Sequence, residues 1–242
     1  MPIGIIINSA AVAVGGILGT LLGNRMSESF KENLTMVFGA CAMCMGISSI
    51  AKMENMPAVI LAVILGTCLG LAIHLGRLIN SAGLRMQGFI SRFVSPPKGI
   101  AQKDFEQQLV TAIVLFCSSG TGIYGAIVSG MNGDHSILLT KSVLDLPTAM
   151  IFACTLGAVV SLIALPQFVI FLLLYLLATV IFPLTTPSMI NDFRACGGLI
   201  VFVTGFRMIR VKNFPVADMI PSMILVMPIS WLWTAYILPV LT

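Results

Sequence analysis

The sequence predicts an all-α fold, a polytopic transmembrane helical bundle of about eight spans, and three observations support this prediction. Of the 242 residues, 58% are hydrophobic and only 9% are charged, whereas an ordinary soluble domain has roughly 25% charged residues. Apolar runs close to the roughly 20 residues that a helix needs to cross a bilayer recur along the chain. The basic residues fall mainly between alternate runs, where they indicate membrane orientation rather than nucleic-acid binding. This composition disfavours a soluble enzyme.

The apolar runs and the polar residues between them define the expected spans. These are residues 3–23, 33–51, 57–76, 108–130, 146–164, 167–184, 193–210 and 217–240. The longest polar connection, 77–107, carries five basic residues, which the positive-inside rule places in the cytoplasm. That choice puts ten of the 13 basic residues inside and both termini outside.

The basic connection also contains a helical pattern. Apolar residues recur at helical spacing from Leu78 to Val94 around Arg85 and Arg92, and Pro96-Pro97 ends the pattern. We expect an interfacial amphipathic helix on the cytoplasmic side of the membrane. A simple cytoplasmic hairpin is the alternative.

Two stretches of the chain resemble each other. Gly39 and Gly46 are seven residues apart, as are Gly198 and Gly205, and a proline follows each pair. Since the spans that carry them run in opposite directions, the similarity predicts an inverted repeat, an architecture common among secondary transporters. We therefore divide the single membrane domain, 1–242, into a first repeat half (1–76), the basic connection (77–107), a Gly-rich central part (108–145) and a second repeat half (146–242). Chance similarity between glycine-containing helices is the alternative.

A glycine-rich stretch, 117–145, is the first candidate for a binding site. Glycines and hydroxyl side chains at its start favour a broken helix, whose exposed backbone groups can bind ions and polar solutes. The residues concerned are Ser118, Ser119, Gly120, Thr121 and Gly122. A packing seam of small residues is an equally good reading of the same composition.

Polar side chains within apolar surroundings complete the candidate pathway. Lys141 and Asp145 are four residues apart, so on a helix they share a face and can neutralise each other, although an outer loop would leave them solvated. Asn33 is expected at the start of the second span, and Asn191 and Asp192 at the start of the seventh, as helix caps or as pathway residues related by the repeat. Asn8 lies within the first span. The six cysteines lie in apolar segments and read as packing residues, so we expect no metal site.

The glycine and charge patterns also resemble a known family. They are Gly4-x3-Asn8-x6-Gly15-Gly16-x2-Gly19, Gly122-Ile-Tyr-Gly125 with Gly130 and Gly133-Asp134, and Lys141-Ser142-x-Leu144-Asp145. These patterns are similar to those of the YqgA/YdfK-like bacterial membrane proteins, a family of unknown function. The resemblance implies a multi-spanning protein of the bacterial inner membrane, of a kind sometimes described as a transport protein, and it implies no substrate.

These observations predict a gradient-driven transporter or ion-conducting protein for a small ion or polar solute. The chain carries no nucleotide-binding, hydrolase or metalloprotease motif, so we expect no enzyme activity and no cofactor. Its expected partners are the lipid bilayer, the transported ion or solute and a second copy of the chain in a homodimer, with no nucleic acid. A membrane scaffold or regulatory subunit that does not transport is the alternative, and an intramembrane enzyme using Asp145 and Asp192 is a third reading.

Overall fold

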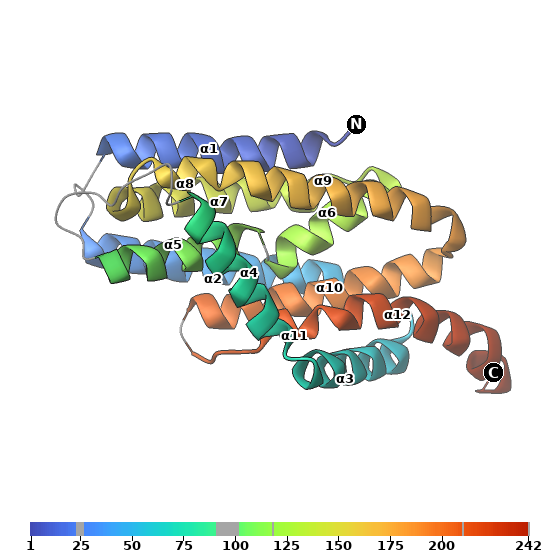
Figure 1. The fold of residues 1–242 in the computed structure, drawn as a ribbon. Helices are drawn as coiled ribbons and strands as arrows, with labels where there is room; N and C mark the ends of the chain where they lie inside the picture. Colours follow the sequence, from blue (N-terminus) through green and yellow to red (C-terminus); the bar gives the residue numbers. More distant parts are fainter. Residues whose placement is uncertain (23–26, 91–101, 118, 210, 242) are drawn as a thin grey trace. The chain divides into compact units, whose positions relative to one another are not determined.

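A computed structural model describes residues 1–22, 27–90, 102–117, 119–209 and 211–241 (Figure 1). The described residues form helices and no strands. Within the described part of the chain, seven helical segments are long and apolar enough to cross a membrane, and the bent pair α3 (Met56–Ala72) and α4 (Leu75–Ile90) makes an eighth if it is counted as one span. The prediction of an all-α polytopic bundle is confirmed.

Three of the predicted spans have wrong boundaries. The sixth begins at Val159 rather than at residue 167, and the other two errors concern the candidate site. The fifth span is α7 (Ser136–Leu156), not 146–164, because Lys141, Asp145 and Pro147 are accommodated inside the helix. The seventh span is α10 (Pro187–Met208), not 193–210. Thr186 caps α10, since its hydroxyl accepts a hydrogen bond from the backbone N–H of Met189 at 3.3 Å. The predicted fifth and seventh spans place the charged residues at span ends, whereas the structure buries Lys141, Asp145 and Asp192 within helices.

The chain divides into two compact units that interleave along the sequence. Unit 1 comprises residues 1–35 and 78–179, and unit 2 comprises residues 36–77 and 180–242. This division follows spatial contacts, whereas the predicted repeat halves follow sequence similarity, so the inverted repeat stays a prediction.

Unit 1 is built around α1 (Ile3–Leu22), which lies along α7 (Figure 1). Two glycines allow this close approach, because a Cβ atom at Gly15 would lie 2.4 Å from the carbonyl oxygen of Leu146, and one at Gly19 would lie 2.3 Å from that of Met150. The unit also contains α5 (Gln102–Cys117), α6 (Gly120–Asn132), α8 (Val159–Leu162), most of α9 (Ala164–Ile181), most of α4 and the first residues of α2 (Glu28–Ile50). Phe105, Leu109 and Phe116 lie in its buried apolar core.

Unit 2 contains residues 36–50 of α2, together with α3, α10, α11 (Val216–Met219) and α12 (Pro221–Leu232). A 3-10 turn η2 (Phe182–Leu184), a π-helical turn η3 (Trp233–Ile237) and α13 (Leu238–Leu241) complete it. Helix α3 packs against α11 and α12 (Figure 1). A Cβ atom at Gly66 would lie 2.3 Å from the Cα atom of Ser222, so this contact also depends on the absence of a side chain.

The glycines that suggested a repeat lie at one helix contact. A Cβ atom at Gly46 would lie 2.7 Å from the carbonyl oxygen of Gly198, and one at Gly205 would lie 2.6 Å from that of Gly39. Helices α2 and α10 therefore approach each other closely at two points, and the equal spacing of the two glycine pairs matches this antiparallel contact.

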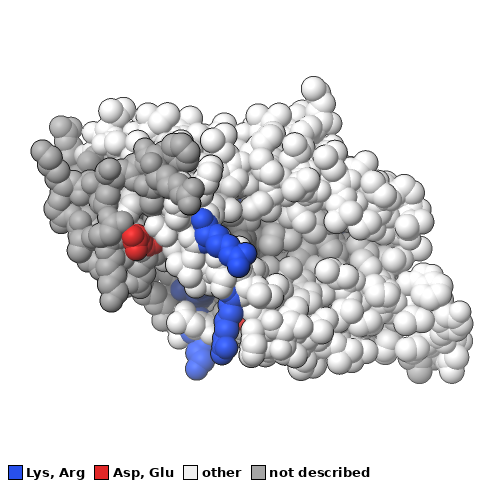
Figure 2. All heavy atoms as spheres, in the orientation of Figure 1, with Lys and Arg blue, Asp and Glu red and all other residues white. Residues whose placement is uncertain are grey.

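The expected amphipathic helix is present in part as α4, and residues 91–94 of the prediction lie outside the described residues. Arg77 and Arg85 are exposed on α4. Figure 2 shows that Lys and Arg side chains gather near the place of α4, while most of the described surface on this face is uncharged. A position at the membrane surface stays a prediction.

Candidate functional site

The candidate site lies in unit 1 and begins with an ion pair inside α7. Lys141 and Asp145 are one helical turn apart, and the ammonium Nζ atom of Lys141 donates to Oδ2 of the Asp145 carboxylate. Only 4% of Lys141 and 7% of Asp145 are exposed. Buried charges of this kind persist where they are paired and hydrogen-bonded, and the predicted pairing of these two residues agrees with the geometry.

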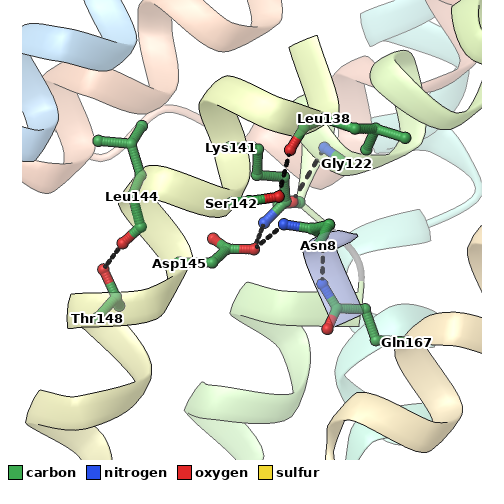
Figure 3. A network of polar contacts seen from close by, with 10 residues as sticks. Asn8, Gly122, Leu138, Lys141, Ser142, Leu144, Asp145, Thr148 and Gln167 are labelled. Carbon is green, nitrogen blue, oxygen red and sulfur yellow. Dashed lines mark hydrogen bonds and ion pairs between the residues drawn. The ribbon is translucent and has the colours of Figure 1, made fainter. Parts of the chain in front are cut away.

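Two amide side chains from other helices extend the pair into a network (Figure 3). Asn8 of α1 donates from Nδ2 to Oδ2 of Asp145 at 2.9 Å. Gln167 of α9 donates from Nε2 to Oδ1 of Asn8 at 2.7 Å. Both amides are fully buried. Three helices thus meet in the Asn8–Lys141–Asp145–Gln167 network, hereafter the charged network.

Small residues of the surrounding helices leave room for the charged network. A Cβ atom at Gly122 of α6 would lie 2.2 Å from Cζ of Phe171 and 3.0 Å from Cε of Lys141. The aliphatic chain of Lys141 therefore lies against a glycine surface, which a larger residue would obstruct. This contact explains why a glycine of the Gly-rich stretch belongs beside the ion pair.

Not every polar atom of the network has a partner. Among the described residues, Oε1 of Gln167 and Oγ of the adjacent α1 residue Ser9 are buried without a hydrogen bond. An unpaired buried polar atom costs roughly 1–3 kcal/mol, so the network is not arranged for stability alone. The amide oxygen of Gln167 is an acceptor, and it is suited to a hydrogen-bond donor or a cation.

The helix break expected at the start of the Gly-rich stretch lies next to this network. Helix α5 ends at Cys117, and Ser119 has an extended backbone and caps α6. The Ser119 hydroxyl accepts from the backbone N–H of Gly122 at 3.1 Å. Gly120 begins α6, and Thr121 is buried in its first turn. Ser118 lies outside the described residues.

Asp192 belongs to a separate network in unit 2. Its Oδ1 atom accepts from the backbone N–H groups of Glu54 and Asn55, at 3.0 and 2.9 Å. Its Oδ2 atom accepts from Nδ2 of Asn55 at 2.9 Å and from the hydroxyl of Ser230 at 2.7 Å. Four donors occupy the carboxylate, which is fully buried, so Asp192 holds the chain where it enters α3.

The other two predicted residues, Asn191 and Asn33, make exposed contacts. Asn191 donates to Oε1 of Glu54 at 2.6 Å in an exposed contact. Asn33 is exposed on α2, and its side chain donates to the hydroxyl of Ser29 at 3.4 Å. Thus the structure brings together Asn8, Lys141 and Asp145 with Gly122 beside them, and it gives Asp192 a different set of partners.

The sequence prediction missed Gln167, Asn55 and Ser230, and a direct repeat in the sequence could have found Asn55. Residues 17–23, Ile-Leu-Gly-Thr-Leu-Leu-Gly, recur 47 positions later as Ile-Leu-Gly-Thr-Cys-Leu-Gly at 64–70. The same interval relates Asn8 to Asn55 and Asp145 to Asp192, the two pairs that are hydrogen-bonded in their units. It relates Lys141 to Ser188, whose hydroxyl accepts from Nδ2 of Asn55. The two networks are variants of one Asn–Asp arrangement, and only the first contains a lysine at this position.

Fold and network together define a polytopic helical membrane protein with a buried charged network in its membrane-spanning part. The chain belongs to the family described as protein of unknown function (DUF554), whose model matches residues 3–231. It is 46% identical over 236 residues to the uncharacterized protein YqgA of Escherichia coli (strain K12), covering 98% of this chain and 99% of that one. It is 25% identical over 222 residues to the uncharacterized membrane protein YdfK of Bacillus subtilis (strain 168), covering 92% and 93%. No solved structure matches the chain.

Proposed function

We propose that this membrane protein carries a small ion or polar solute across the bacterial inner membrane, as a gradient-driven transporter or an ion-conducting protein. The observation that carries the proposal is the ion pair of Lys141 and Asp145 inside α7, bonded to amides from two other helices. We further propose that the chain acts without enzyme activity, and that two copies form the working assembly.

The cost of burying charge supports this proposal. A charged side chain at the centre of a membrane helix costs about 2.5–3.5 kcal/mol on insertion scales, and such residues mark ion and substrate pathways. A scaffold needs tight helix contacts, which the glycines of α1 and α3 already provide without charge. The charged network is therefore better explained by transport than by packing.

Ligand-dependent thermal unfolding of the purified protein in detergent tests the proposal. The ligands are alkali and divalent cations, inorganic anions, amino acids and organic acids. A ligand at 100 times its dissociation constant stabilises the folded protein by about 2.7 kcal/mol. We expect at least one class to raise the melting temperature of the wild type and to have no effect on the double variant K141M/D145N, which carries no unpaired buried charge.

A matched control separates binding from general stability. Thr148 lies on the next turn of α7, and its hydroxyl donates only to the carbonyl oxygen of Leu144 at 2.7 Å (Figure 3). T148V should keep the ligand response. If no ligand of any class stabilises the wild type, or if K141M/D145N responds like the wild type, the proposed function fails and a scaffold role is favoured.

A further inference from the structure

The charged network is electrically neutral, and this constrains what it can bind. It contains one ammonium group and one carboxylate, and Asn8 and Gln167 add no charge. A cation that joined the buried pair would leave one uncompensated positive charge, which a site of low polarity resists. A cation can therefore enter without a net change of charge only if a positive charge leaves.

The second network indicates that this fold can bury the carboxylate without a lysine. Asp192 is fully buried, and two backbone N–H groups, an amide and a hydroxyl donate to its carboxylate. Ser188 stands 47 positions after Lys141. Because neutral donors suffice in unit 2, the ammonium group in unit 1 is an additional feature. The ammonium group donates to the Asp145 carboxylate itself.

The oxygen atoms of the charged network suit a cation better than an anion. The Oε1 atom of Gln167 is a buried acceptor without a partner among the described residues. Carboxylate and amide oxygens are the ligands that hard cations prefer. One carboxylate balances one positive charge, so a monovalent cation fits the charge of the site and a divalent cation does not.

We propose that the charged network binds a monovalent alkali cation at Asp145 in exchange for one proton of Lys141. This inference rests on the proposed function and assigns it a substrate class. The cation displaces the ammonium group from the carboxylate, and the lysine N–H bond that breaks leaves its electron pair on Nζ, which becomes a neutral amine. The proton departs to the opposite side of the membrane. One positive charge enters and one leaves, so the exchange is electroneutral.

Few other titratable groups face the pair. The thiol of Cys117, at the end of α5, interacts electrostatically with both Lys141 and Asp145. Helices α1 and α8 carry no titratable side chain, and α6 and α9 contribute only the phenols of Tyr124 and Tyr175. His135 precedes α7 and is bonded to the hydroxyl of Ser129 at 2.7 Å. Lys141 is thus the basic group placed to release a proton next to Asp145.

The experiment uses proteoliposomes of the full-length protein that contain a pH-sensitive dye. An inward sodium or lithium gradient is imposed with equal potassium on both sides and valinomycin, which holds the membrane potential at zero. Potassium and rubidium gradients are imposed without valinomycin, and choline is the control ion. We expect an alkali cation entering the vesicles to drive protons out, at a rate that an imposed membrane potential does not change.

Three variants test whether Lys141 supplies the exchanged proton. Arginine keeps the positive charge but does not deprotonate in proteins, so K141R should fold and lose at least tenfold in cation-driven proton movement. K141Q has no proton to release and should pass the cation without proton countermovement, as measured with a radiolabelled cation. T148V should exchange at a rate within about twofold of wild type. Melting temperatures in detergent establish that each variant is folded.

Each of the other possible results contradicts one specific claim of the proposal. Proton exchange that survives in K141R, or in K141Q, shows that Lys141 does not supply the proton. Cation flux in the wild type without proton movement would contradict the proposed cation–proton exchange, but it would still support the proposed transport function. If the folded wild type moves no alkali cation, the exchange is wrong, and flux of anions or neutral solutes in the same vesicles decides the proposed function separately.

Discussion

At the scale of single residues, the chain stabilises a buried carboxylate in two different ways. Asp145 is held by a lysine and an amide, and Asp192 is held by four neutral donors. The first arrangement contains an ammonium group and, among the described residues, an amide oxygen of Gln167 without a partner, while four donors contact the carboxylate in the second. We therefore assign ligand exchange to Asp145 and a structural role to Asp192.

The ion pair leads to a prediction about stability. K141M or D145N alone leaves a buried charge unpaired, which typically costs 3–5 kcal/mol, whereas loss of both charges is much milder. We expect the free energy of unfolding in mixed micelles to fall by about 3 kcal/mol or more in each single variant, and by less than either in K141M/D145N. Losses that simply add in the double variant would contradict the pairing.

A second prediction concerns Asp192. An amide at this position has only one oxygen, so D192N leaves two of the four donors without an acceptor, and we expect a loss of about 1–3 kcal/mol in unfolding free energy. The neighbouring variant N191A loses only an exposed contact with Glu54 and should change stability by less than about 0.5 kcal/mol. Chemical unfolding in micelles measures both. Equal stability of D192N and N191A would refute the structural role of the carboxylate.

At the scale of helices, glycines allow neighbouring helix axes to approach each other closely. In unit 2, Gly46 faces Gly198 and Gly39 faces Gly205 at the contact of α2 with α10. In unit 1, Gly15 and Gly19 bring α1 onto α7, which places Asn8 within hydrogen-bonding distance of Asp145. The packing of the helices and the chemistry of the site are therefore linked through residues that have no side chain.

Glycine substitutions test this link. We expect G198V to overpack the contact with α2 and to lower the free energy of unfolding by about 1–3 kcal/mol. Gly88 of α4 is the control, because no atom lies within 4 Å of a Cβ atom added there. G88A should be neutral or stabilising by up to about 1 kcal/mol, as expected for alanine in a helix. Thermal unfolding in detergent compares the two, and a G198V protein as stable as G88A would show that the contact is looser than described.

The sequence predicts the helices better than their ends, for a physical reason. Hydropathy identifies a span because its residues face lipid, but Lys141, Asp145 and Asp192 are buried against other helices, so their charge says nothing about a span end. Pairing at positions 141 and 145 follows from helical periodicity alone. Gln167 comes from a distant helix, and only the packing of α1 and α9 around Asn8 shows that it belongs to the site.

At the scale of the whole molecule, we predict eight crossings, with α3 and α4 counted as one span, which would place both termini on the same side of the membrane. The excess of Lys and Arg in alternate connections predicts that this side is outside the cell. A reporter domain that is active only outside the cytoplasm should therefore be active when it is fused to the C-terminus. A reporter that is active only in the cytoplasm should be inactive there. An active cytoplasmic reporter at the C-terminus would contradict the predicted orientation.

The most direct test of the central claim is uptake of radiolabelled sodium or rubidium into proteoliposomes that contain wild type, T148V or K141M/D145N at matched amounts of folded protein. Our account predicts equal uptake by wild type and T148V, and uptake at the level of empty vesicles for K141M/D145N. Uptake by K141M/D145N at the wild-type rate would show that the charged network is not the pathway.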